Sequence, residues 1–356
     1  MTDAADNIGT TAVRAGFAFD EAALEQWMRA NVPGYAGPLR VLQFRGGQSN
    51  PTYRLDTPGR RYVLRRKPPG VLLKGAHAVE REARVLAALG SIDYPVAHVH
   101  ALCAEADVIG TPFYVMDLVE GRVFWDASFS DLPRGERAGY FEAMNTAIAG
   151  LHAINPAAVG LADYGRPGDY FARQIARWSG QYHADTQAGR NPDMDRLIDW
   201  LHANVPVGDD DTGIIHGDFR CDNIIFALTG PRILAVLDWE LSTLGHRGAD
   251  FAYHTMMYRM PPHIVAGLGG ADVGALGLPS EDEYVAAYCA RRGLSDLPNY
   301  DFYVAFNFFR LAAIFHGIKG RVLRGSAASA QARQRVEVLP ELMRLAWAQA
   351  EHVNCR

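Results

Sequence analysis

The sequence predicts an α+β fold in two lobes: a small N-terminal lobe with an antiparallel sheet and helices, and a mostly helical C-terminal lobe that contains a β-hairpin. Short β-rich segments separated by turns recur early in the chain, whereas later segments have apolar residues at helical spacing. A chain of 356 residues is long enough to form two such lobes. We expect the N-terminal lobe to span residues 1–119 and the C-terminal lobe residues 120–356.

The elements of the N-terminal lobe are expected in a simple order. They are a helix at residues 20–32, strands at 41–44, 53–55 and 61–65, an amphipathic helix at 76–89 and a segment at 113–121 that reads as a strand ending in a turn. Pro33 and Gly34 end the first helix, and Gly90 ends the second. A glycine-containing turn at residues 45–50 joins the first two strands, so backbone N–H groups there could approach an anion.

The C-terminal lobe is expected to be mainly helical. Helical spacing occurs at residues 135–154, 170–178, 194–203 and 336–351, and an apolar run at 302–315 predicts a buried helix. Pro261-Pro262 and a glycine-rich segment at 267–277 predict a loop.

The most informative stretch is residues 216–223, which read His-Gly-Asp-Phe-Arg-Cys-Asp-Asn. A short apolar strand at 214–215 leads into it and another at 223–226 leaves it. After a turn at 229–231, residues 232–237 are expected to return antiparallel, which would carry Asp238 back beside Asn223 and Asp218.

These residue types suit phosphoryl transfer. The reaction needs positioning and neutralisation of phosphate charge by Mg²⁺, which prefers oxygen ligands such as those of Asn223 and Asp238. Asp218 could orient an acceptor hydroxyl and take up its proton. Glu240 is a further candidate near the metal, and we expect His216 to brace the loop backbone.

The spacing resembles that of kinases, in which H-x-D, four residues and N are followed by D after the next hairpin. The forms H-G-D and D-W-E are similar to those of the aminoglycoside and choline kinase-like phosphotransferases rather than to the H-R-D and D-F-G of protein kinases, and no A-P-E segment follows. The resemblance implies a bilobal protein-kinase-like fold, with ATP and Mg²⁺ as cofactors.

The resemblance also implies which upstream residues contact the nucleotide. The phosphate loop would comprise Gly46, Gly47, Gln48, Ser49 and Asn50. The strand cation would be Arg65 in place of the usual lysine, with Arg66 and Lys67 as alternatives, and it would pair with Glu82 rather than Glu80. Met116, Asp117 and Val119 would lie at the hinge, where backbone groups bind adenine.

The branch is indicated by residues 64–70, Ala76-His77 and Arg81-Glu82, which resemble the kinase-like domains of acyl-CoA dehydrogenase 10/11-type proteins. This implies a hydroxyacyl-CoA or hydroxy acid as acceptor. Residues 302–336 contain basic side chains but no Asp or Glu, which favours an anionic acceptor and marks Arg310, Lys319 and Arg321 as candidates to bind it. An aminoglycoside phosphotransferase and a regulatory pseudokinase remain the alternatives.

Composition excludes little. A net charge of −5 gives no reason to expect a nucleic-acid or membrane partner. The four cysteines lack metal or disulfide spacing, and no apolar signal segment or membrane span is evident. We therefore expect a cytoplasmic protein whose partner is a small-molecule acceptor. The oligomeric state is open.

Overall fold

The computed structural model describes residues 9–45, 50–70, 78–166, 168–325 and 330–354. By its internal contacts the chain forms two compact units. The first comprises Met1–Val123, Pro156–Tyr164 and Asp222–Ser242, and the second comprises Phe124–Asn155, Gly165–Cys221 and Thr243–Arg356. This division groups residues 222–242 with the N-terminal segment, whereas the predicted lobes divide the chain once. The predicted boundary between two lobes at residues 119 and 120 stays a prediction.

The first unit contains a six-stranded antiparallel sheet with the order β1-β2-β3-β4-β6-β5. Its strands are β1 (Thr10–Thr11), β2 (Arg40–Phe44), β3 (Thr52–Asp56), β4 (Arg61–Arg66), β5 (Val99–Cys103) and β6 (Phe113–Asp117). The expected strands at 41–44, 53–55, 61–65 and 113–121 are confirmed as β2, β3, β4 and β6. Strand β5, which has a register shift at the sheet edge and no clear alternation, was not predicted.

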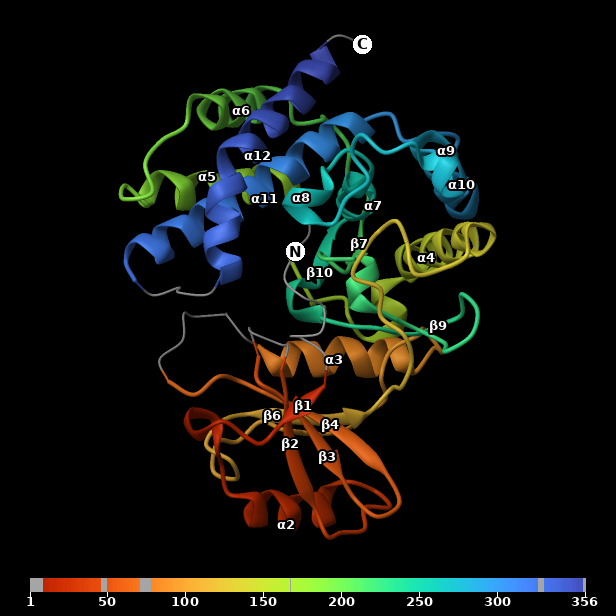
Figure 1. Ribbon diagram of the computed structural model, residues 1–356, viewed down its shortest axis with the longest axis vertical. Helices are drawn as coiled ribbons and strands as arrows, with labels where there is room; N and C mark the ends of the chain where they lie inside the picture. Colours follow the sequence, from red (N-terminus) through yellow and green to blue (C-terminus); the bar gives the residue numbers. More distant parts are fainter. Residues whose placement is uncertain (1–8, 46–49, 71–77, 167, 326–329, 355–356) are drawn as a thin grey trace. The chain divides into compact units, whose positions relative to one another are not determined.

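The pleat of the sheet gives its two faces different neighbours, because successive side chains of a strand point to opposite sides. Tyr62 and Leu64 of β4 pack with helix α2 (Glu21–Asn31) in one apolar cluster. Val63 and Arg65 point to the other face, which helix α3 (Val79–Gly90) covers (Figure 1). Both helices were predicted, and the Asp20 side chain caps α2 by accepting a bond from the Ala23 N–H.

The hairpin of the first unit forms as the sequence predicts. Strand β8 (Ile224–Phe226) pairs antiparallel with β9 (Ile233–Val236). Its edges are attached to the rest of the unit, because the Val236 N–H donates to the Pro95 carbonyl at 2.8 Å and Arg122 forms a β-bridge with Phe226. The hairpin therefore belongs to the compact unit that contains the sheet.

The second unit is mostly helical and contains one two-stranded antiparallel sheet. Its long helices are α4 (Arg134–Ala153), α5 (Tyr170–Ala184), α6 (Pro192–Ala203), α7 (Arg247–Thr255), α10 (Glu281–Arg292), α11 (Tyr300–Leu323) and α12 (Ala330–Asn354). Strand β7 (Thr212–Ile215) pairs with β10 (Thr243–His246), so the predicted strand before the His-Gly-Asp stretch has a partner that the sequence did not indicate.

The expected loop, marked by Pro261-Pro262 and residues 267–277, contains two helical turns that were not predicted. They are α8 (Pro262–Val265) and α9 (Val273–Leu276). Gly267 is required by close packing, because a Cβ there would lie 2.0 Å from the Met260 carbonyl oxygen.

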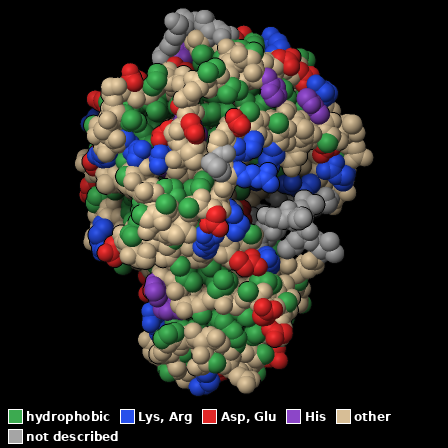
Figure 2. Space-filling model, turned by 180° about the vertical axis from the view of Figure 1, so that it is seen from behind, with side chains coloured by type: hydrophobic (Ala, Val, Ile, Leu, Met, Phe, Trp, Pro, Cys, Tyr) green, Lys and Arg blue, Asp and Glu red, His purple; other side chains and the backbone are tan. Residues whose placement is uncertain are grey.

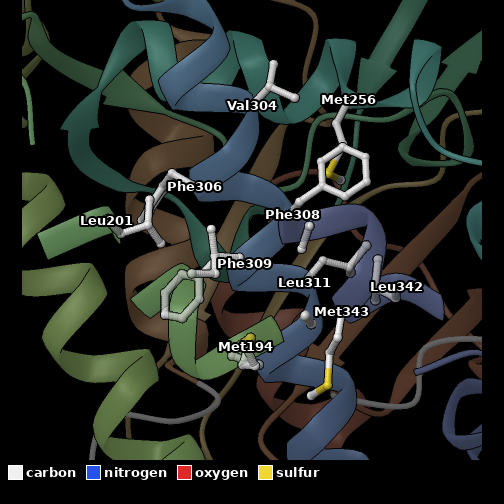
Figure 3. Packing of buried hydrophobic residues seen from close by; sticks show 14 of the residues in the cluster. Met194, Leu201, Met256, Val304, Phe306, Phe308, Phe309, Leu311, Leu342 and Met343 are labelled. Atoms are coloured by element: carbon white, nitrogen blue, oxygen red, sulfur yellow. The ribbon is translucent and has the colours of Figure 1, made fainter. Parts of the chain in front are cut away.

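The core of the second unit surrounds α11, whose central residues are buried on almost every side. Figure 3 shows Phe308 of this helix near Met256, and Met343 of α12 close to Leu311. The expected buried helix at 302–315 is thus confirmed, although it is longer than predicted.

Within the described residues, none of the helices has an apolar stretch long enough to cross a membrane. Acidic and basic side chains are interspersed over much of the face in Figure 2.

Candidate nucleotide and catalytic sites

The first unit contains a cavity of about 320 Å³. Its lining residues come from the sheet, α3, the segment after β6 and the hairpin, and they are Phe44, Thr52, Val63, Arg65, Glu82, Leu86, Ala97, Tyr114, Met116, Asp117, Leu118, Val119, Asn223, Ile225, Val236, Leu237, Asp238 and Trp239. Most of these side chains are apolar, and four of the polar ones are charged. An apolar cavity with a few charged groups is suited to a planar base that bears an anionic group.

Arg65 connects three carboxylates of the first unit, one from α3 and two from the short segment that follows β9. Its Nε lies 3.1 Å from Glu82 Oε2, and its Nη2 lies 2.7 Å from Asp238 Oδ1 and 3.8 Å from Glu240 Oε2. A planar guanidinium can hold two carboxylates at once, which the point charge of a lysine does less well.

Burial and charge act together on this group. Burial raises the pKa of Glu82 to about 7, although Arg65 acts against that rise. For Arg65, burial lowers the pKa, but Glu82, Tyr114 and Asp238 raise it above its ordinary value. Arg65 therefore stays cationic in the cavity.

Arg66, Lys67 and Glu80, the other candidates from the sequence, do not line the cavity. Arg66 is buried on the opposite face of the sheet, where its guanidinium lies 5.3 Å from the centre of the Phe19 ring. Lys67 Nζ pairs with Glu80 at 2.7 Å. Of the three basic residues considered from the sequence, Arg65 alone lines the cavity, and of the two glutamates, Glu82 does.

The predicted hinge residues Met116, Asp117 and Val119 also line the cavity. The Asp117 carboxylate accepts bonds from His100 Nε2 at 2.8 Å and Arg60 Nη2 at 2.7 Å. Although burial raises the pKa of Asp117, these two partners lower it below its ordinary value. The side chain is thereby held in the sheet. A role for this segment in adenine binding would have to come from its backbone.

Asn223 and Asp238 are brought together by the hairpin. The Leu237 N–H donates to the Asn223 carbonyl at 2.8 Å. Asn223 and Asp238, which follows Leu237, both line the cavity. Asp238 has a left-handed backbone with φ 62°, which Asp and Asn tolerate better than most residues.

An amide oxygen and carboxylates fit Mg²⁺ chemically. The described residues contain no group of three or more His, Cys, Asp or Glu side chains that could hold a metal ion. A magnesium ion would therefore need other ligands as well, and Mg²⁺ often obtains them from water and substrate phosphates.

The predicted phosphate loop is described only at its end. Gly46, Gly47, Gln48 and Ser49 lie outside the described residues. Asn50 is buried beside β3, where its carbonyl accepts a bond from Thr52 Oγ at 3.0 Å.

The loop that contains Asp218 lies in the second unit and has an extensive set of backbone contacts. The Asp218 N–H donates to His216 Nδ1 at 3.1 Å, so His216 braces the loop as its buried position suggests. The Asp250 carboxylate accepts from the N–H groups of His216 and Gly217 at 2.8 and 2.7 Å. Arg310 donates to the Gly217 carbonyl at 2.8 Å.

Tyr253 and Asp250, which contact this loop, are residues that the sequence pattern did not identify. The Tyr253 hydroxyl donates to Asp218 Oδ1. Asp250 also pairs with His152 at 3.1 Å, and Tyr288 lies 2.7 Å from the other ring nitrogen of His152. Burial raises the pKa of Asp250, but its bonds with His152 and the loop lower it overall. Spacing alone gives no signal for partners that lie so far along the chain.

The three predicted acceptor-binding residues lie on α11. Arg310 is buried, and its guanidinium lies 5.2 Å from the centre of the Tyr253 ring. Lys319 is half-buried and Arg321 is exposed. The contacts of Arg310 direct it to the loop at residues 216–223.

We expect acid to destabilise the second unit through His254. Burial lowers the pKa of His254 to about 4 from an ordinary value of 6.5, so this group resists protonation when folded and accepts a proton when unfolded. Its contribution to stability is complete above pH 6.5 and is lost as the pH falls to about 4. The loss should be on the order of 3 kcal/mol.

Urea unfolding across this pH range would measure the effect. His254→Gln should show a smaller loss of stability in acid than the unmodified protein. His202→Gln is the control, because His202 is exposed. Equal acid sensitivity in the His254 variant and the unmodified protein would contradict the prediction.

Comparisons with known proteins identify the family of the chain. The model of the phosphotransferase enzyme family matches residues 40–306. The chain is 41% identical to mouse acyl-CoA dehydrogenase family member 10 and 42% identical to chicken family member 11. These matches cover 95% and 94% of the chain but 32% and 44% of the relatives, so the chain spans less than half of their length.

Solved structures give the same result. A Ralstonia eutropha protein assigned as an aminoglycoside phosphotransferase has 47% identity and a TM-score of 0.87, with 94% of this chain and 99% of that chain covered. Aminoglycoside phosphotransferase APH(4)-Ia, crystallised with AMP-PNP and hygromycin B, has 16% identity and a TM-score of 0.53 over 90% of this chain and 98% of its own. The second comparison shows the fold alone. The chain belongs to the phosphotransferase enzyme family and has the aminoglycoside phosphotransferase, protein-kinase-like fold.

Proposed function

We propose that the protein transfers the γ-phosphoryl group of ATP, with Mg²⁺, to a hydroxyl of a small molecule. The observation that carries this proposal is the position of Arg65, which pairs with Glu82 and Asp238 at the charged part of an otherwise apolar cavity. A buried arginine that is held by two carboxylates can bind phosphate oxygens without first having to be ordered.

The residues of the cavity would divide the work of nucleotide binding. The apolar walls and the backbone at Met116, Asp117 and Val119 would hold the base, and Arg65 would bind phosphate oxygens. Asn223 and Asp238 would hold Mg²⁺, with Glu240 as an additional candidate. When bound, the ion would neutralise phosphate charge during transfer.

Asp218 would act as the base. A carboxylate in a loop whose backbone is fixed by Asp250 and Arg310 can orient an acceptor hydroxyl and accept its proton. The phosphoryl group would pass from the β,γ-bridging oxygen of ATP to the acceptor oxygen, with ADP as the leaving group.

The charges around Asp218 support an anionic acceptor. Partial burial and the positive charges of Arg220 and Arg321 lower the pKa of Arg335, whereas Asp218 and Tyr253 raise it. Arg335 therefore lies within electrostatic range of the proposed base, and Arg220 and Arg321 lie within range of Arg335. Positive charge at these positions would attract an anion and repel a polycation.

The curated relatives support the same acceptor class. Both are named as members of an acyl-CoA dehydrogenase family, and the region that matches this chain is part of the same polypeptide. We therefore propose a hydroxyacyl-CoA or a hydroxy acid as the substrate. The alternatives are an aminoglycoside, which structural relatives bind, and a regulatory role without turnover.

A coupled ADP-release screen would test the proposal. We expect turnover with hydroxyacyl-CoAs or free hydroxy acids and none with aminoglycosides or amino alcohols. Removal of Mg²⁺ with a chelator should abolish the turnover. Activity with aminoglycosides alone would favour the first alternative. If no acceptor gives ADP release although calorimetry confirms ATP binding, the result would favour the regulatory role.

A further inference from the structure

We propose that Tyr253 is a positioning residue for Asp218, and that Arg310 supports both Tyr253 and the loop. The inference rests on the proposed function, because it assigns Tyr253 to the orientation of the base that the reaction requires. It adds a hydroxyl from helix α7 to a site that sequence motifs describe only through the loop itself.

Helix α7 contacts the loop residue by residue. Asp250 accepts bonds from the backbone of His216 and Gly217, and Tyr253 donates to the side chain of Asp218. His254 Nδ1 lies 3.2 Å from the Phe219 carbonyl. Positions three and four residues apart lie on the same face of a helix, so one turn of α7 contacts four consecutive loop residues.

The contact of Tyr253 differs in kind from the other two. Asp250 and His254 contact backbone atoms, whereas Tyr253 contacts the carboxylate that is proposed to accept the proton. Because the backbone of the loop is already fixed, the remaining freedom of Asp218 is rotation of its side chain. A hydrogen bond to one carboxylate oxygen restricts that rotation and sets the direction of the other oxygen.

The environment keeps Tyr253 in its role as a donor. Its side chain is 7% exposed. Burial and then the charge of Asp218 raise the pKa of Tyr253 above its ordinary value, so the hydroxyl keeps its proton. Burial also favours a hydroxyl that has a partner.

Arg310 supports this arrangement from helix α11. Its guanidinium lies over the Tyr253 ring at 5.2 Å and donates to the Gly217 carbonyl at 2.8 Å. One side chain thus contacts both the loop and the ring of the residue that orients Asp218. Such a cation–π contact is strengthened where the groups are desolvated.

Tyr253→Phe tests the proposal, because it removes the hydroxyl and keeps the ring that packs against Arg310. With an acceptor that the unmodified enzyme uses, we expect kcat to fall roughly 10- to 100-fold, since small errors in orientation have effects of this size. The KM for ATP should change by less than about twofold. The melting temperature should stay near that of the unmodified enzyme.

Tyr258→Phe is the matched control. Tyr258 follows α7, is 9% exposed and donates to the Pro279 carbonyl at 3.1 Å. Removal of its hydroxyl is a similar buried change without contact to the loop, so kcat should be kept. Arg310→Lys separates two roles: loss of kcat with an unchanged acceptor KM supports positioning, whereas a raised acceptor KM with an unchanged kcat would overturn the assigned role of Arg310.

Crystal structures of the unmodified protein and Tyr253→Phe provide a readout that does not depend on turnover. We expect the Asp218 carboxylate to occupy a single rotamer in the former and to move or split in the latter. An unchanged Asp218 rotamer together with an unchanged kcat would overturn the proposal. If the unmodified protein phosphorylates no acceptor, the proposed function fails, and the rotamer comparison alone decides whether Tyr253 positions Asp218.

Discussion

Replacement of Asp218 by asparagine is expected to lower kcat by a factor of about 10³ and to leave nucleotide affinity nearly unchanged. Asparagine keeps the shape of the side chain and can accept the bond from Tyr253, but it cannot take up the proton of the acceptor hydroxyl. General base catalysis typically contributes effects of this size. Steady-state ADP release measures kcat, and calorimetry with a non-hydrolysable ATP analogue measures nucleotide binding.

The separation of the two effects follows from the division of the chain. All residues that line the cavity belong to the first unit, whereas Asp218 belongs to the second. Asp222→Asn is the control, because it removes the same charge four residues further along the loop. Near-normal turnover in Asp218→Asn would exclude Asp218 as the base. A parallel loss of nucleotide affinity would indicate a binding role instead.

The order of elements was predictable because most of the signal is local. β-rich composition between turns identified β2, β3 and β4, start and stop signals identified α2, and helical spacing identified α3. The turn at 229–231 identified the hairpin in the same way. Each of these depends on residues within one short segment, so a single sequence contains the information.

The choice of cation shows where local reasoning stops. Arg65, Arg66 and Lys67 are equivalent as charges, and the sequence left open which of them would bind phosphate. The pleat assigns Arg65 to the face with Val63 and Arg66 to the face with Leu64. Alternation separates the two arginines, but only the packing of α2 and α3 shows which face contains the cavity.

The contacts that support the loop at residues 216–223 were not predictable for a different reason. Asp250 and Tyr253 lie more than thirty positions along the chain from the groups that they contact, as the separations of 34 and 35 residues show. Arg310 was predicted to bind the acceptor from the charge of residues 302–336, and that role stays a prediction; its contact with the Gly217 carbonyl was not foreseen. Charge composition cannot distinguish a cation that faces solvent from one that donates to a buried carbonyl.

Replacement of Asp238 by asparagine is expected to reduce kcat by a factor of about 10³ or more, and to remove the increase in nucleotide affinity that Mg²⁺ provides. Of the two proposed ligands, Asn223 and Asp238, only Asp238 carries a charge. An amide is a weaker ligand for Mg²⁺ than a carboxylate. Asp238 is also the 2.7 Å partner of Arg65, so the change removes one of the negative charges that hold that guanidinium. Calorimetric titration of nucleotide with and without Mg²⁺ measures the binding effect separately from turnover.

Asparagine is the suitable replacement because Asp238 has a φ of 62°, which asparagine tolerates and alanine does not. Asp93→Asn is the matched control, since Asp93 is an exposed residue of the first unit with a φ of 57°. Glu240→Gln tests the other acidic candidate, which lies farther from Arg65 at 3.8 Å. Retention of the Mg²⁺ effect in Asp238→Asn, with its loss in Glu240→Gln, would transfer the metal-binding role from Asp238 to Glu240.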